Sequence, residues 1–378
     1  MTDTISLLEK LIACPSVTPV DAGAQEILAE ELTKLGFECH HLPFSDETGE
    51  VPNLFARLGT GSPHICFAGH TDVVPVGDEA AWTSGPFDPQ IRDGVIYGRG
   101  SSDMKGGVAA FVAAVSSYLE SNKPQGSISL LITGDEEDLA VNGTVKVLEW
   151  MKENGHVPDV ALVGEPTNPE HLGQEIKLGR RGSLNGYITV KGVQGHVAYQ
   201  HLADNPVPRL IKLTDALASY EFDQGNEFFP PTNLEITSID VGNPATNIIP
   251  AAGHASFNIR FNDQWSSTSI KEKIAELLDS TGADYGIEFE GNAESFITKP
   301  GAWSEIVRDS VADITGRTPE YTTSGGTSDA RFVVNYCPTI ECGAINESIH
   351  QVDENAKVSD LEDLTQIYIR ILERYFAD

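Results

Sequence analysis

Candidate metal ligands follow several apolar stretches of the chain, at the points where strands are expected to end. GHTD at 69–72 follows HICFA, DEED at 135–138 follows SLLIT, and Glu165 follows VALV. Asp103 precedes an Ala- and Val-rich segment, and His350 comes after TIECGAI. Because the carboxyl ends of parallel strands meet at one edge of a sheet, where ligands bind, we expect these side chains to converge.

Imidazole and carboxylate donors without thiolate suit zinc, and also cobalt or manganese. Two histidines and at least three carboxylates exceed the three protein ligands of a usual catalytic zinc site. A pair of metals about 3.5–4 Å apart, bridged by one carboxylate and one water, would use them all. His70 and His350 would then be terminal ligands, Asp103 the bridge, and Glu137 and Glu165 the remaining ligands.

The acids beside these ligands suggest supporting roles. Asp72, two residues after His70 on a strand, would point the same way and orient the imidazole. Glu136 and Glu137 are neighbours, and neighbours on an extended chain face opposite ways, so one would bind metal. The other would act as general base, taking a proton from water and passing it to the leaving amine.

Each cluster also has an ordinary interpretation when it is taken singly. HTD and GEPT (164–167) are typical of turns, and DEED is typical of a solvated loop. Asp103 followed by Lys105 is typical of a helix N-cap. Five such clusters at five strand ends favour the joint interpretation as a metal site.

The elements that must position these residues alternate between strand and helix. We expect strands at 53–58, 65–68, 127–132, 160–163 and 339–342, and helices at 21–35, 104–119, 144–152, 303–315 and from an N-cap at Ser359 to Tyr375. Alternation of this kind predicts an α/β fold with a mostly parallel, mixed sheet flanked by helices.

The middle of the chain has a different pattern. It predicts strands at 184–190, 234–241, 255–261 and 285–290, with helices at 203–220 and 267–278. The order β-α-β-β-α-β is that of a ferredoxin-like unit. We therefore expect a discontinuous catalytic domain at 1–178 and 294–378, interrupted by an inserted domain at 179–293.

The composition narrows the class of protein. Acidic residues outnumber basic ones 56 to 25, for a net charge of −31, which disfavours nucleic acid and anionic membrane as partners. No apolar run approaches the roughly 18 residues that span a bilayer, and the N-terminus lacks the basic region of a signal peptide. The five cysteines contain no C-x-x-C pair, which favours reduced thiols in a cytoplasmic protein.

The chain resembles the family of di-zinc amidohydrolases and exopeptidases that includes aminoacylase and glutamate carboxypeptidase. The motifs that carry this resemblance are GHTDVVP, GRGSSDMKGG, TGDEED, GEPT and NESIHQVDE. The resemblance covers essentially the whole chain. It implies two Zn²⁺ per subunit, with Co²⁺ able to replace one, and a cis peptide bond between Asp103 and Met104. It also assigns the general base to Glu136, the residue behind the imidazole of His70 to Asp72, and the metal ligands to His70, Asp103, Glu137, Glu165 and His350.

The resemblance also gives roles to the inserted domain, as a lid and as the contact of a homodimer. His196 would reach the active site of a neighbouring subunit and stabilise the oxyanion. The residues implied for the substrate site are Arg180, Ser183, Tyr199, Asn247, Arg260, Gly326, Thr327 and Asn346. Two positions depart from the family pattern: Gln200 stands where proline is usual, and Asp138 where a small residue is usual.

Longer stretches, including IKLGRRGSLNGYITVKGVQGHVAYQHLADNP and TSGGTSDARF, resemble the branch of the family that acts in bacterial lysine and diaminopimelate biosynthesis. The implied reaction is hydrolysis of N-succinyl-L,L-2,6-diaminopimelate to succinate and L,L-2,6-diaminopimelate by a water bridging two zinc ions. Arg180 and Arg260 suit this anionic substrate, because guanidinium groups bind carboxylates in pairs of hydrogen bonds. The alternatives are an N-acetylornithine deacetylase, a related N-acyl amino acid amidohydrolase or a broad dipeptidase, and, in another class, a non-catalytic binding protein.

Overall fold

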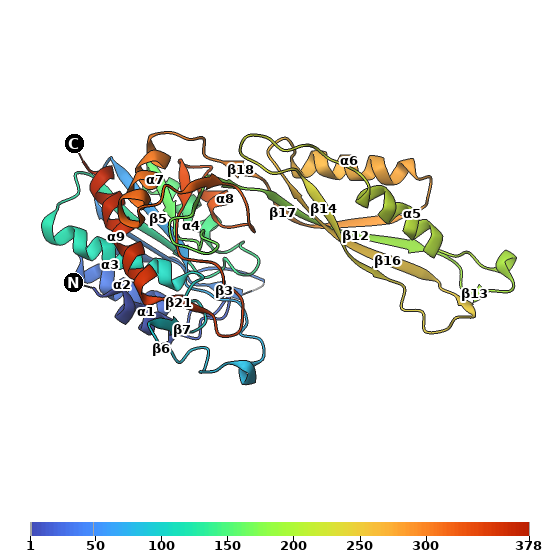
Figure 1. Cartoon of the computed structure of the whole chain (residues 1–378), viewed down its shortest axis with the longest axis horizontal. Coiled ribbons are helices and arrows are strands. Elements are labelled where there is room, and N and C mark those ends of the chain that lie inside the picture. The colour runs from blue at the N-terminus through green and yellow to red at the C-terminus, as the bar shows by residue number, and fades with distance from the viewer. Residues whose placement is uncertain (1, 48, 378) are drawn as a thin grey trace. The chain divides into compact units, whose positions relative to one another are not determined.

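The computed structural model describes residues 2–47 and 49–377. The chain divides into two compact units, each with its own sheet. The first unit comprises Met1–Gly179, Thr298–Thr322 and Ser328–Asp378, and the second comprises Arg180–Ile297 with Thr323–Thr327. Figure 1 shows the elements of each unit by label and by colour along the chain.

The first unit contains a mixed sheet whose central strands are parallel. In spatial order the strands are β1 (Glu38–His41), β4 (Leu54–Gly59), β8 (Ser127–Thr133), β5 (His64–His70), β9 (Val160–Val163), β20 (Thr339–Glu341), β10 (Glu175–Lys177) and β19 (Glu320–Thr322). Strands β8, β5, β9 and β20 run parallel to one another. Every residue of β5 and β8 is buried, as is typical of parallel strands covered on both faces.

Helices surround this sheet. They are α1 (Thr4–Ile12), α2 (Ala24–Lys34), α3 (Lys105–Ser121), α4 (Thr144–Glu153), α7 (Ala302–Thr315), the short α8 (Ala330–Val333) and α9 (Val358–Tyr375). Helix α3 lies against α1 and α9, and α9, red in Figure 1, also packs on α7. Phe67 of β5 stacks on Phe111 of α3 with their ring centroids 4.3 Å apart, so this layer is fixed to the centre of the sheet. The predicted α/β fold is confirmed.

The second unit is built from β12 (Gly182–Lys191), α5 (Val207–Ala218), β14 (Asn233–Asp240), β16 (Ala252–Phe261), α6 (Ser267–Ser280) and β17 (Gly286–Ala293). Its sheet order, β14-β16-β12-β17, is antiparallel throughout, so the predicted ferredoxin-like order is confirmed. Alternate residues of β12 and β16 are buried, together with Leu210, Leu213 and Leu217 of α5. One face of the sheet and one face of each helix therefore form a single core.

Three predicted helix starts are wrong. Helix α2 begins at Ala24 rather than at 21, after a turn in which Gly23 takes a left-handed conformation. The last helix begins at Val358 with Lys357 as its N-cap, not at Ser359, because β21 (Asn355–Lys357) pairs with β7 (Val95–Tyr97) and leads straight into the helix. Helix α5 begins at Val207 rather than at 203, because the backbone of Asp204 exchanges hydrogen bonds with Val193. Proline at 206 then sits at the helix start, where its missing N–H costs nothing.

The short strands β10 and β19 at one edge of the large sheet, and β1 at the other, lay outside the predicted elements. Within the described residues, no helix is both long and apolar enough to cross a membrane.

Candidate metal centre

The four parallel strands bring the predicted ligands to one edge of the large sheet. His70 is the last residue of β5 and is paired in register with Thr133, the last residue of β8. Glu165 follows β9 by two residues, and β20 lies beside β9 in register. The strand ends therefore place the loops that carry Glu136, Glu165 and His350 around His70.

Two groups of ligand atoms form there, and they share one aspartate. His70, Asp103 and Glu165 make the first group, and Asp103, Glu137 and His350 make the second; in each group the ligand atoms lie within 4.8 Å of one another. The Nε2 atom of His70 is 3.3 Å from Oδ1 of Asp103 and 3.5 Å from Oε1 of Glu165. The Nε2 atom of His350 is 3.5 Å from Oδ2 of Asp103 and 3.2 Å from Oε1 of Glu137. The two oxygens of Asp103 thus face different histidines.

The donor atoms fit a bound cation. His70, Asp103 and Glu165 are buried, at 1%, 8% and 8% exposure. Among the described residues, Nε2 of His70 and Oδ1 of Asp103 are buried without a hydrogen-bond partner. Buried polar atoms are normally satisfied, so an unpaired imidazole nitrogen and an unpaired carboxylate oxygen that face each other are what a metal site requires.

The electrostatics of the cluster are those of acids crowded around two histidines. Burial alone would lower the pKa of His70, but the carboxylates of Asp103 and Glu165 outweigh it and raise that pKa well above its usual value. The carboxylates of Asp103 and Glu137 raise the pKa of His350 to about 10. Without a bound cation, both histidines would therefore be protonated, and their positive charge would take the place of the metal's.

Glu136 has the environment of a proton-accepting group. Burial, followed by repulsion from Glu165, raises its pKa well above the usual value. The repulsion also comes from Asp329, a buried acid that precedes α8. A raised pKa makes the carboxylate a stronger proton acceptor.

The expectation that Glu136 and Glu137 face opposite ways is wrong. Both residues lie in a turn after β8 rather than on an extended chain. Their carboxylate oxygens and a ring nitrogen of His70 all lie within 4.8 Å of one another. Only Glu137 is also grouped with His350 and Asp103, so it is the better placed of the pair to bind between them.

Asp72 lies beyond the end of β5, and its contact with His70 differs from the expected one. The backbone carbonyl of Asp72 is 2.9 Å from Nδ1 of His70, whereas its carboxylate oxygen is 3.6 Å away. That carboxylate instead accepts a hydrogen bond of 3.0 Å from the backbone N–H of Glu137. Asp72 therefore ties the imidazole of His70 to the loop that carries both glutamates.

The local backbone allows close approach around the ligands. The peptide bond between Asp103 and Met104 is cis, as the resemblance implies. A Cβ added at Gly107 in α3 would lie 2.5 Å from the carbonyl oxygen of Gly164, and one at Gly343 would lie 2.3 Å from that of Glu165. Glycine at these positions lets helix and loop pack directly against the segment that carries Glu165.

The predicted substrate residues are divided between the units. Asn346 lies in the first unit, and the others, from Arg180 to Thr327, lie in the second together with His196. Within the second unit, Arg180 is buried and donates to the carbonyl of Gly326 at 3.2 Å. Ser183 and Arg260 both contact Asn258, at 3.2 Å and 3.0 Å. Ser183, Asn258 and Arg260 alternate with the core-facing residues of β12 and β16, so they lie on the face of the sheet opposite the helices.

His196 lies on a short strand of the same unit, and Asn247 lies in the turn just before the strand that pairs with it. β13 (Gly195–His196) pairs with β15 (Ile248–Ile249), and the N–H of Val197 donates to the carbonyl of Asn247 at 3.1 Å. The ring of His196 lies beside that of Tyr199, with their centroids 5.6 Å apart. His196, Tyr199 and Asn247 are all exposed.

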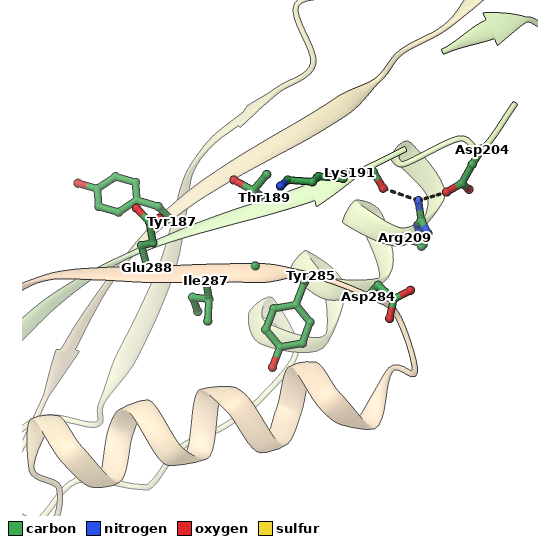
Figure 2. Close-up of a pocket in the computed structure, with 10 residues that line it drawn as sticks. Tyr187, Thr189, Lys191, Asp204, Arg209, Asp284, Tyr285, Ile287 and Glu288 are labelled. Atoms are coloured by element: carbon green, nitrogen blue, oxygen red, sulfur yellow. Dashed lines mark hydrogen bonds and ion pairs between the residues drawn. The ribbon is translucent and has the colours of Figure 1, made fainter. Parts of the chain in front are cut away.

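A separate hollow of about 630 Å³ opens on the second unit beside β12 and β17 (Figure 2). Its charged lining has both signs, with Lys191 and Arg209 near Asp204, Asp284 and Glu288. The guanidinium of Arg209 donates to the carbonyl of Lys191 and to Asp204, each at 2.7 Å. The hollow contains no predicted site residue, and its arginine is already engaged, so it is a weak candidate for an anionic substrate.

Residues that the sequence did not single out complete the surroundings of the metal centre. Arg99, Asp329 and Glu354 are buried close to the ligands. Arg99 lies in GRGSSDMKGG, Asp329 in TSGGTSDARF and Glu354 in NESIHQVDE. A charged residue in a glycine-rich or ligand-bearing segment was therefore the sequence signal that could have identified each of them.

The sequence pattern of peptidase family M20/M25/M40 matches residues 66–374. The chain belongs to this family. It is 57% identical over 377 residues to a succinyl-diaminopimelate desuccinylase of Rhodospirillum centenum, covering 99% of this chain and 98% of the relative. It is 52% identical over 375 residues to a protein of the same name from Xanthobacter autotrophicus, covering 99% of each.

Solved structures share the fold. An M20 family metallo-carboxypeptidase of Sulfolobus solfataricus superposes with a TM-score of 0.81 at 20% identity, over 99% of both chains. A dinuclear metal-binding peptidase of the M20 family from Bacillus subtilis superposes with a TM-score of 0.72 at 14% identity, over 99% of this chain and 97% of that one. The cluster around Asp103 is compatible with a metal centre of that kind.

Proposed function

We propose that the chain hydrolyses N-succinyl-L,L-2,6-diaminopimelate to succinate and L,L-2,6-diaminopimelate, in the biosynthesis of lysine and diaminopimelate. The observation that carries this proposal is the match along almost the whole chain to relatives named succinyl-diaminopimelate desuccinylase, at 51–57% identity. An N-acetylornithine deacetylase would use a similar metal site, but the relatives do not favour it.

We further propose a centre of two metal ions, with zinc in both positions and Co²⁺ able to replace one. His70 and Glu165 would hold one ion, Glu137 and His350 the other, and Asp103 both. The shared position of Asp103 between the two ligand groups supports this assignment. Bound metals of this kind polarise a carbonyl group and lower the pKa of a water molecule.

Glu136 is the proposed general base. It takes a proton from the attacking water and returns it to the amine that leaves, which its raised pKa supports. Asp72 holds His70 and the Glu137 backbone in place through the contacts described above. Asn346, in the first unit, is a proposed contact of the substrate.

The inserted domain predicted at 179–293, which makes up most of the second unit, is proposed as a lid and as the contact of a homodimer, with the catalytic domain at 1–178 and 294–378. His196 and Asn247 act in the active site of the partner subunit, where His196 stabilises the oxyanion. Arg180, Ser183, Tyr199, Arg260, Gly326 and Thr327 bind the substrate. Burial lowers the pKa of Arg260, so a carboxylate partner there would be strongly favoured.

The chain is proposed to work in the cytoplasm. Its five cysteines are all free thiols, and four of them are buried, which suits a reducing compartment. Burial raises the pKa of Cys66 to about 11 and that of Cys342 to about 12, so these thiols are inert rather than metal ligands.

A substrate comparison tests the proposal. Metal-stripped protein receives two equivalents of zinc and is offered N-succinyl-L,L-diaminopimelate, N-acetylornithine and a dipeptide in separate assays. Zinc-dependent release of succinate, with no turnover of the other two, is the expected result. Turnover of acetylornithine or the dipeptide alone would support hydrolase activity but contradict the proposed substrate.

A further inference from the structure

A buried ion pair lies directly behind the loop that carries Asp103. Nη1 of Arg99 donates to Oε2 of Glu354 at 2.6 Å, and the two residues are only 2% and 1% exposed. The cost of removing two charges from water commonly offsets their attraction, so a pair this deeply buried is weak evidence for stability. A role in holding neighbouring groups in position would explain why the pair is buried.

The second oxygen of Glu354 supplies that explanation. Oε1 accepts the backbone N–H of Ser102 at 3.0 Å and that of Asp103 at 3.1 Å. These two bonds fix the peptide groups that lead into Asp103, and charge-assisted bonds of this type are strong and directional. Arg99 neutralises Glu354 from the other side, and its guanidinium also lies over the ring of Trp82 at 5.3 Å.

The segment that contains Glu354 also carries His350. The hydroxyl of Ser102 donates to the carbonyl of Ile345, and the N–H of Gly98 donates to the carbonyl of Glu354 at 2.9 Å. Strand β21, which starts at Asn355, pairs with β7, which ends at Tyr97. The loop before Asp103 and the loop around His350 are thus fastened together at both ends.

This arrangement controls the one residue that both ligand groups share. Oδ1 of Asp103 faces His70 and Oδ2 faces His350, so a small rotation of its carboxylate would separate the groups. In the proposed assignment, each of the other ligands binds only one metal. The binding of two metals therefore depends most on where Asp103 lies relative to His350.

We propose that Glu354 and Arg99 are positioning residues that hold Asp103 and the His350 loop in one arrangement, so that the aspartate can serve two metal ions at once. The inference rests on the proposed metal centre and extends it to residues that touch no metal. Residues behind metal ligands commonly change metal affinity about 10–100-fold when they are replaced.

Asp223 provides a matched control in the second unit. Its Oδ1 accepts the backbone N–H of Gly225 at 2.8 Å and that of Thr232 at 3.1 Å, as Glu354 does for Ser102 and Asp103. Replacing either carboxylate by its amide removes one charge and leaves the size of the side chain unchanged. A general effect of losing a backbone-binding carboxylate should appear in both variants, and an effect on the metal centre only in one.

The test compares the wild-type protein, Glu354→Gln and Asp223→Asn, all stripped of metal. Zinc binding is followed by titration calorimetry, the visible spectrum is recorded with Co²⁺, and the melting temperature of each metal-free protein is measured. We expect Glu354→Gln to bind at least one of the two ions about 10–100-fold more weakly, with an altered cobalt spectrum. Asp223→Asn should keep the affinities and the spectrum of the wild type. Arg99→Lys should change both in the same direction as Glu354→Gln, and it replaces that variant if Glu354→Gln does not fold.

Unchanged zinc affinities and cobalt spectrum in Glu354→Gln would overturn the inference while leaving the proposed function intact. Equal losses of affinity in Glu354→Gln and Asp223→Asn would overturn it as well, because the effect would then be general. A wild-type protein that takes up fewer than two ions would instead overturn the proposed centre, and this inference with it.

Discussion

The metal centre and the proposed substrate residues of the second unit are built in opposite ways. The ligands around His70 are mostly buried, and they sit at the ends of parallel strands or in loops held by several hydrogen bonds. His196, Tyr199 and Asn247 are exposed, and they lie on two-residue strands and a turn. The first arrangement lies within one unit of one chain, whereas the second leaves its side chains open to solvent.

This difference suggests a division of labour. A rigid scaffold suits groups whose geometry must be held closely for chemistry. Exposed groups on a separate unit suit the selection of a substrate and closure over it. The variants below test whether the chemistry depends on the first region and the selection on the second.

The largest effect is expected at Glu136. Glu136→Ala should lower kcat about 10²–10⁴-fold, the usual contribution of a general base. Because Glu137, not Glu136, is grouped with Asp103 and His350, two zinc ions should still bind. Steady-state kinetics and the zinc content measured together check this. A variant with near wild-type kcat would exclude Glu136 as the base.

His196→Ala should lower kcat about 10²–10³-fold if His196 stabilises the oxyanion. Action across a dimer adds a sharper expectation, because mixing His196→Ala subunits with Glu136→Ala subunits should restore activity. One site of each mixed dimer would then have both groups intact. Mixtures that stay as inactive as their components would place His196 outside the partner's site.

Arg260→Leu should raise KM for the succinylated substrate more than it lowers kcat. A hydrogen bond to a charged group contributes about 1.5–3 kcal/mol, which corresponds to roughly a 10–150-fold change in KM. Kinetics on the succinylated substrate and on a succinate-free analogue measure this. An equal loss on both substrates would mean that Arg260 does not bind the succinyl carboxylate.

A smaller effect concerns the pH dependence of stability in the metal-free protein. The pKa of His350 is raised to about 10 in the folded state, above that of about 6.5 in an unfolded chain. Its protonation therefore stabilises the fold fully below pH 6.5, and this contribution is lost as the pH rises towards 10. Bound zinc would replace the proton and weaken the trend.

Thermal melts of apo and zinc-loaded protein between pH 6 and 10 follow this effect, with His350→Ala as the control. The slope for the metal-free wild type should exceed that for His350→Ala. Identical slopes would show that the neighbouring acids do not hold a proton on His350.

The sequence predicted the parts of the structure that depend on local patterns. Apolar runs such as SLLIT marked the central strands, and the polar residues after them marked the edge where His70 and Glu165 meet. Alternating patterns gave the order of the ferredoxin-like unit. These signals are local because the residues of a strand depend on its burial. A strand buried on both faces is mostly apolar, and a strand buried on one face alternates between apolar and polar residues.

Contacts between distant segments escaped prediction. Glu354 binds the backbone of Asp103 across a separation of 251 residues, and neither segment carries a mark of the other. The wrong N-cap at Ser359 has the same origin, because the pairing of β21 with β7 sets where the last helix begins. The orientation of Glu136 and Glu137 depended on a turn that their sequence does not distinguish from an extended end of a strand.

The separation between Asp103 and the loop around His350 also has a consequence for synthesis. His70, Asp103, Glu137 and Glu165 all precede the second unit along the chain, whereas His350 and Glu354 follow it. A nascent chain emerges from its N-terminus at about 5–20 residues per second and folds as it does so. A chain halted within the second unit therefore carries every proposed ligand except His350, and it can acquire a complete pair of metals only after the His350 loop has left the ribosome.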